Sequence, residues 1–253
     1  MGMAYTSLRD YLADLEPDGL FTRVMEPVST HLELTEIGTR LIDQGGPAVL
    51  FENVTNERGQ KSDIPALINL FGTVERVARA VTLGGKPKTN ASELREVGEL
   101  LAYLRQPEPP KGVGDALKMA PLIKTIMAMR PKTVKKAPCQ DVVLLGKDAD
   151  LDRLPIQTCW PNEPAPLITW PLVVTQGPGD SPQDVPNLGI YRMQKLGKHQ
   201  TLMRWLATRG GAQQFARWKT ANPGKPMPLA AVIGADPGTI LAAVTPVPDT
   251  LSE

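Results

Sequence analysis

A basic stretch punctuated by proline, Arg130–Pro138, separates two parts of the sequence with different patterns, and this change constrains the fold most. Before it, apolar residues at helical spacing alternate with short apolar runs, which predicts an α/β layer domain at residues 1–129. After it, short apolar runs separated by turn residues predict an antiparallel sheet or small barrel at residues 139–253. We therefore expect fold class α+β, with a linker at residues 130–138.

Capping signals and residue spacing place the expected elements. Ser7 begins a helix, with Asp10 as a partial capping box, and Thr30 begins another that Gly45–Gly46 ends as a left-handed C-cap. The other elements expected in the first domain are strands at 21–25, 48–51 and 64–69, and helices at 73–81, 90–104 and 115–129. In the second domain we expect strands at 141–145, 170–175, 188–192, 201–205 and 228–233, and helices at 211–220 and 237–243.

Charge and cysteine content narrow the class of protein. The 28 Lys and Arg residues and 27 Asp and Glu residues are interspersed, so we expect no nucleic-acid partner, which would require a basic stripe. The N-terminus lacks the layout of a signal peptide, and no apolar run approaches the roughly 20 residues of a membrane span. Cys139 and Cys159 lack metal-type spacing, so we expect reduced, structural thiols in a cytoplasmic protein.

Residues 118–136 combine lysines and an arginine with apolar side chains. This pattern has two interpretations. One is a basic amphipathic segment that contacts a membrane surface, and the other is a core helix followed by a solvated linker.

The strongest candidate site lies within residues 187–211, which place an asparagine, three arginines and four glycines in about two strands and a turn. Asn187 is either a turn residue or a ligand for a hard divalent ion such as Mg or Mn. Arg204, Arg209 and the Gly210–Gly211 amides at a helix start either hold a phosphate or form a glycine turn whose arginines pair with acids.

Other site chemistries lack their signals. The only histidines, His31 and His199, form no cluster with cysteine, so a zinc site is not expected. Neither nucleotide-binding glycine fingerprint occurs, and there is no nucleophile-elbow motif or catalytic triad pattern.

Five motifs, taken together and in order, resemble the UbiD family of decarboxylases. They are Asn187–Arg192, Met203–Leu206, Arg209–Ala212, Ile233–Pro237 and Val244–Glu253. The resemblance implies a flavin-reductase-like split β-barrel in the second domain, incomplete at its C-terminus. It also implies non-oxidative decarboxylation, with closest similarity to the members that act on 3-polyprenyl-4-hydroxybenzoate in ubiquinone biosynthesis.

The resemblance implies prenylated FMN as cofactor, with Mn or Mg and a monovalent cation beside it. By motif position, Asn187 and Glu253 correspond to metal ligands, and Arg192 to a catalytic arginine that can orient the substrate carboxylate. The residues that correspond to cofactor-binding segments are Ile190, Tyr191, Arg192, Arg204, Trp205, Leu206, Arg209 and Gly210. The modified flavin would act as the electron sink when CO2 leaves.

The sequence departs from the family pattern in two respects. No histidine lies near the turn at 209–211, which leaves the third metal ligand open. The family is about twice this length, and its proton-donating acid and oligomerisation domain lie beyond the position of Glu253. We therefore expect a fragment that is inactive alone, from a protein that is a homo-oligomer at full length and cytoplasmic, or peripheral at the inner membrane face. The alternatives are a decarboxylase of another aromatic or unsaturated acid, and a non-catalytic cofactor-binding module.

Overall fold

The computed structural model describes residues 5–81, 94–95, 98, 102, 134–179, 181 and 184–245. Most of the expected helix at 90–104, all of the one at 115–129, and Glu253 lie outside the described residues. The basic segment at 118–136 does so too, except for its last three positions.

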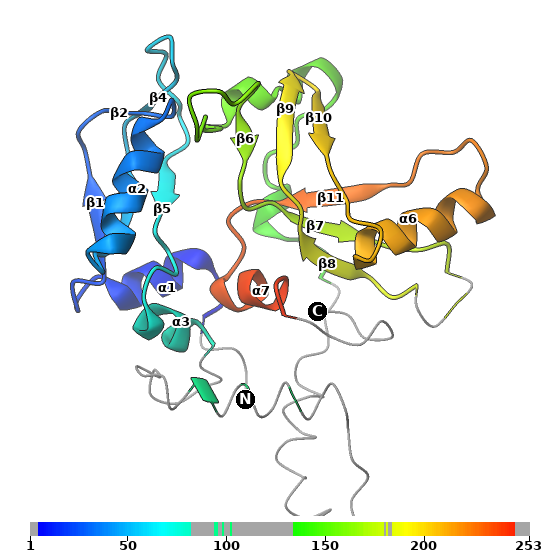
Figure 1. Cartoon of the computed structure of the whole chain (residues 1–253), viewed down its shortest axis with the longest axis horizontal. Coiled ribbons are helices and arrows are strands. Elements are labelled where there is room, and N and C mark those ends of the chain that lie inside the picture. Colours follow the sequence, from blue (N-terminus) through cyan, green and yellow to red (C-terminus); the bar gives the residue numbers. More distant parts are fainter. Residues whose placement is uncertain are drawn as a thin grey trace, which may run out of the picture.

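Over its described residues 5–81, the N-terminal part combines three helices with two small sheets (Figure 1). Its helices are α1 Leu8–Leu15, α2 Glu33–Asp43 and α3 Val74–Ala80. Its strands are β1 Phe21–Val24, β2 Val28–Ser29, β3 Ala48–Phe51, β4 Val54–Thr55 and β5 Ala66–Ile68. The central strand β3 pairs with β1 in parallel and with β5 antiparallel, while β2 and β4 form a separate parallel pair. These elements confirm the α/β character predicted for this part.

The helix ends follow the capping signals closely. The Ser7 hydroxyl accepts the Asp10 N–H at 3.2 Å, as expected for the start of α1. At the end of α2, Gly45 has φ of +63°, and the Gly46 N–H donates to the Leu41 carbonyl at 2.7 Å. This Schellman geometry requires a left-handed residue, which glycine adopts without steric cost.

The predicted start of α2 at Thr30 was wrong, because the helix begins at Glu33. The backbone of Thr30 is bonded across the fold: its N–H donates to the Thr55 carbonyl at 2.8 Å, and its carbonyl accepts the Thr158 N–H at 2.9 Å. These two bonds tie Thr30 to β4 and to the segment at Thr158, so it lies in the turn before the helix. The chain then turns into the helix at Leu32, whose φ is +65°.

The C-terminal part is built from two antiparallel sheets, in the orders β10-β9-β6 and β11-β7-β8. Its strands are β6 Leu167–Ile168, β7 Leu172–Thr175, β8 Asn187–Ile190, β9 Met193–Gly197, β10 Gln200–Met203 and β11 Leu229–Val232. Its helices are α6 Gly210–Ala221 and α7 Pro237–Ala242, and α6 packs against β7 and β8 (Figure 1). Short 3₁₀ turns occupy Pro138–Gln140, Gly146–Asp148 and Leu151–Arg153.

One expectation for this part stays a prediction, and another needs correction. The described strands do not close into a barrel, so the split barrel is not confirmed in this portion of the chain. The strand predicted at 141–145 is wrong: Val142 and Leu145 are 74% and 75% exposed and lie in an irregular segment between two 3₁₀ turns. An apolar run becomes a strand only where a neighbouring strand supplies hydrogen bonds, and no described strand lies against this one.

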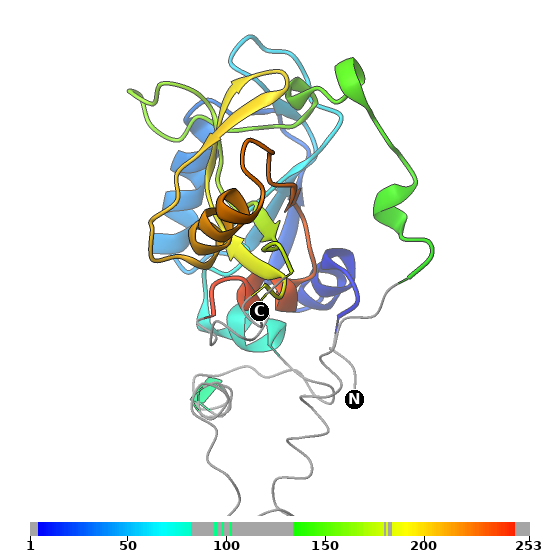
Figure 2. The same ribbon diagram turned by 90° about the vertical axis from the view of Figure 1, so that its right-hand side faces the viewer.

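The two parts of the chain share a core. Leu70 and Phe71, which follow β5, pack against the buried cluster around α1 and also against the cluster formed by β7 and α7. Phe71 stacks on Trp170 with ring centroids 5.7 Å apart. Seen from the side, α7 lies between α1 and the β-rich part (Figure 2). Burial of one apolar face therefore depends on residues from both ends of the sequence.

Candidate functional site

Asn187 and Gly210 are in direct contact, although 23 positions separate them in the sequence. Asn187 begins β8 and is buried, and Gly210 is the first residue of α6. A Cβ atom added at Gly210 would overlap Oδ1 of Asn187 and would lie 2.8 Å from its Cγ. The amide side chain therefore occupies the space that a side chain at the helix start would need.

An aromatic cluster fixes the start of α6. The Gly211 N–H donates to the Tyr191 hydroxyl at 3.1 Å. The Tyr191 ring meets Trp205 edge to face at a centroid distance of 5.8 Å, and Trp205 meets Phe215 in the same way at 5.7 Å. A Cβ at Gly211 would lie 3.2 Å from the Tyr191 ring, so the ring packs directly on the backbone. One first-turn N–H is thus satisfied by a side chain, as helix starts require.

Of the three arginines of the segment, Arg209 is the N-cap of α6, while Arg192 and Arg204 follow β8 and β10. Arg192, Arg204 and Arg209 are exposed, and within the described residues none of them forms an ion pair with a carboxylate. Arg192 instead places its guanidinium 5.3 Å from the centroid of the Trp160 ring, a cation–π contact. The alternative in which these arginines pair with acids is therefore not what the described part of the chain shows. Their charge is available to an anion.

Strand β8 presents different residues to its two faces. Asn187 and Gly189 are buried, and Asn187 faces α6. Leu188 and Ile190 pack on the opposite side, against the cluster that includes Leu70 and Phe71. Because side chains alternate along a strand, the site and the shared core lie on opposite faces of β8. The side chain of Ile190, predicted to bind the cofactor, is thus part of the core.

The remaining predicted residues lie around the same helix start. Arg209 is the N-cap of α6, Trp205 is half-buried in the aromatic cluster, and Leu206 is exposed between β10 and α6. Of the two predicted metal ligands, the structure describes only Asn187. Within the described ranges, no group of three His, Cys, Asp or Glu side chains gathers into a metal site.

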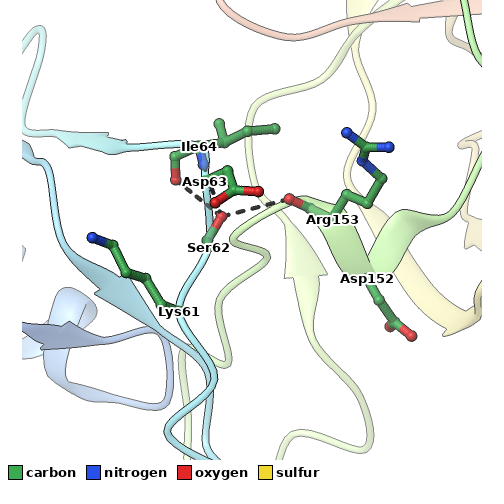
Figure 3. Close-up of a pocket in the computed structure, with 6 residues that line it drawn as sticks. All are labelled: Lys61, Ser62, Asp63, Ile64, Asp152 and Arg153. Carbon is green, nitrogen blue, oxygen red and sulfur yellow. Dashed lines mark hydrogen bonds between the residues drawn. The ribbon is translucent and has the colours of Figure 1, made fainter.

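Two cavities lie away from this helix start. A cleft of about 480 Å³ separates the loop at 55–62 from the segment at 152–158. A smaller adjoining cavity of about 100 Å³ is shown in Figure 3, where the charged ends of Lys61 and Arg153 point away from each other. Sequence reasoning did not anticipate this cleft, since no local motif links segments so far apart. Its lining includes the ion pair between Lys195 and Asp152, and none of the predicted site residues lines it.

None of the helices in the described part of the chain has the length and apolar character that a membrane crossing requires.

Comparison with known proteins agrees with the geometry. Residues 12–101 match the family model for the N-terminal domain of 3-octaprenyl-4-hydroxybenzoate carboxy-lyase, UbiD, and residues 132–253 match the model for its Rift-related domain. The chain belongs to the UbiD family. The resemblance inferred from five motifs is thereby confirmed.

Solved structures of similar proteins extend this result. Vanillic acid decarboxylase of Sedimentibacter hydroxybenzoicus, in its closed form, is 25% identical with a TM-score of 0.75 over 99% of this chain and 47% of its own. The UbiD-class enzyme HmfF of Pelotomaculum thermopropionicum, in complex with FMN, is 25% identical with a TM-score of 0.68 over 94% of this chain and 44% of its own. An evolved dimeric form of HmfF was solved with prFMN and matches at the same identity and TM-score, over 94% of this chain and 47% of its own. The present chain therefore spans just under half the length of the structures it matches.

Proposed function

We propose that this chain is the cofactor-binding part of a prenylated-FMN-dependent carboxy-lyase that removes CO2 from an aromatic acid. The observation that carries the proposal is the Asn187–Gly210 contact at the start of α6, whose N-cap Arg209, like Arg192 after β8 and Arg204 after β10, has no carboxylate partner in the described residues. This arrangement concentrates positive charge and backbone donors, which together suit a phosphate group. The FMN and prFMN complexes of related HmfF support the same identity for the ligand.

The residues present fit the cofactor in defined roles. Arg204, Arg209 and the first-turn amides of α6 other than that of Gly211, which is bonded to Tyr191, would take up its phosphate oxygens. The amide oxygen of Asn187 suits a hard divalent ion such as Mn or Mg, with Glu253 proposed as a second ligand and a monovalent ion beside it. When bound, the modified flavin supplies the electron sink for decarboxylation. Arg192 would bind and orient the carboxylate of the substrate, so we propose it as the catalytic residue.

We propose two candidate substrates, in order of preference. The descriptions of both family models name a prenylated 4-hydroxybenzoate, which makes 3-polyprenyl-4-hydroxybenzoate of ubiquinone biosynthesis the first candidate. A similar structure is a vanillic acid decarboxylase, so a smaller aromatic acid is the second. We also propose that the second domain is a flavin-reductase-like split barrel and that the full-length protein is a homo-oligomer. We propose a cytoplasmic location, and residues 118–136 as the segment that would make any peripheral contact with the membrane.

Equilibrium binding of FMN and riboflavin to this chain tests the phosphate site. Riboflavin lacks only the phosphate, so it is a matched control ligand. Two or more charge-assisted hydrogen bonds to phosphate should make FMN bind about 10- to 100-fold more tightly than riboflavin in fluorescence titrations with Mn present. Equal affinity for the two ligands would contradict the proposal.

The metal assignment has its own test. Asn187→Ala should remove the increase in FMN affinity that Mn produces in the wild-type chain, because a hard ion loses an oxygen ligand. Asn222→Ala, the same substitution at the other end of α6, is the control and should retain the increase. An undiminished Mn effect in Asn187→Ala would show that Asn187 is not a ligand.

A further inference from the structure

The segment before β8 runs along α6 and contacts it at three successive levels. Asn187 meets Gly210 at the start of the helix. The side-chain amide of Gln214 donates to the Val185 carbonyl at 2.7 Å, and Arg217 Nε donates to Asp184 Oδ1 at 2.9 Å. We refer to the last of these, the ion pair between Asp184 and Arg217, as the α6 anchor.

The spacing of these contacts matches the geometry of both elements. Gly210, Gln214 and Arg217 stand at i, i+4 and i+7, so they form one row on the helix. Seven residues of helix advance about 10.5 Å, and three residues of chain span at most about 10 Å. The segment from Asp184 to Asn187, which bends at Val185, therefore has no length to spare along this row, and the position of one end restricts the position of the other.

Asp184 is held firmly enough to act as a fixed point. Its side chain is only 2% exposed, and its second oxygen accepts the Gly179 N–H at 3.1 Å. A Cβ at Gly177 would overlap Oδ1 of Asp184, so the carboxylate lies against the backbone of the preceding loop. Charged hydrogen bonds of this kind are directional, unlike apolar packing, and therefore specify one register of α6 along the segment.

We propose that Asp184 and Arg217 are positioning residues for the cofactor site: the α6 anchor sets the helix along the 184–187 segment so that Gly210 meets Asn187. The phosphate donors at the start of α6 and the metal ligand at the start of β8 are thereby aligned on the same anion. This inference rests on the proposed function, since it concerns how the same site is assembled. It adds two residues, one helix turn or more from the ligand, that contact neither phosphate nor metal.

The test measures the ratio of riboflavin to FMN dissociation constants, with Mn present, for Asp184→Asn and Arg217→Gln. Misplacing the donors should lower the FMN preference of the wild-type chain by about tenfold or more while riboflavin affinity stays unchanged. Lys219→Gln, on the same helix but over the Phe215 ring, removes an equal charge and should keep the wild-type ratio. Arg217→Lys keeps the charge without the Nε donor, so it is the variant to use if the others do not fold, and its ratio should be intermediate.

The outcomes separate the two proposals. A wild-type chain without FMN preference overturns the phosphate site and the α6 anchor together. A wild-type preference that the folded Asp184 and Arg217 variants retain overturns the α6 anchor alone, even if their melting temperatures fall, because that result shows a merely structural ion pair.

Discussion

Gly210→Ala is the substitution that most directly probes how the site is built. Gly210 is the first residue of α6, and its φ does not require glycine. Helix propensity alone would favour alanine by up to about 1 kcal/mol. The contact with Asn187 opposes this gain, because the added methyl group would overlap Oδ1 and lie 2.8 Å from Cγ.

The magnitude follows from the surroundings of Asn187. Its side chain is buried, and its backbone is held in β8, which pairs with β7. Either the amide must leave its position or the helix start must move, and overpacking of this kind costs about 1–3 kcal/mol. After the propensity gain is subtracted, we expect Gly210→Ala to lower the free energy of unfolding by about 1 kcal/mol. We also expect it to abolish Mn-dependent tightening of FMN binding.

Gly38→Ala supplies the matched control. Gly38 lies in α2, where a Cβ would meet only the Ile68 side chain at the ordinary distance of 3.9 Å. That variant should gain up to about 1 kcal/mol from propensity alone. Urea unfolding with comparison of midpoints and slopes measures both changes. If Gly210→Ala stabilises the chain as Gly38→Ala does and keeps the Mn effect, the close contact with Asn187 is refuted.

Three further predictions concern stability and its dependence on pH. Arg76→Met should cost about 3 kcal/mol in urea unfolding, because the fully buried guanidinium donates to the backbone carbonyls of residues 46, 69 and 70, and each would lose this hydrogen bond. A smaller loss than that of Arg40→Met, an exposed control, would contradict this. The hydrogen bond from Lys198 lowers the pKa of Asp150 in the folded state. The stabilisation from this hydrogen bond is therefore fully present above the pKa of Asp150 in the unfolded state, about 3.9, and is lost as the pH falls through the lower pKa of the folded state. The difference in free energy of unfolding between wild type and Asp150→Asn should therefore shrink when the pH falls below about 4, and also when the salt concentration is raised. A difference that stays constant under both changes would refute this role of the hydrogen bond. Tyr191→Phe removes the acceptor of a first-turn N–H of α6 and should cost about 1 kcal/mol in thermal unfolding, whereas an unchanged midpoint would show that water replaces the hydroxyl.

The sequence predicted the elements that depend on local chemistry. The Ser7 and Gly45 ends of helices were placed correctly because the contacts that decide them lie within a few residues along the chain. Where a distant segment decides, the prediction failed. Thr30 looks like an N-cap, but Thr158 binds its backbone as part of a bridge. The run at 141–145 has the composition of a strand and lacks a described partner.

The candidate site divides along the same line. Motif resemblance placed Asn187 and Gly210 in one site, and the structure brings them into contact. The contacts that hold them there, from Gln214 to Val185 and from Arg217 to Asp184, leave no local signal. A glutamine and an arginine on a helix are ordinary surface residues by composition. Only the register of the helix against the segment before β8 gives them a role.

The shared core connects the N-terminal part to this site. Phe71 stacks between Tyr11, at 6.4 Å, and Trp170, at 5.7 Å, so it joins α1 to the segment that leads into β7. Phe71 also packs against the buried cluster of Leu172, Ile240 and Ala243, and Leu188 and Ile190 pack on that cluster from the face of β8 opposite Asn187. Because β8 is packed from both faces, its position is fixed by the N-terminal part on one side and by α6 on the other. The N-terminal part therefore acts on the site through β8, although no residue predicted to bind the cofactor comes from it.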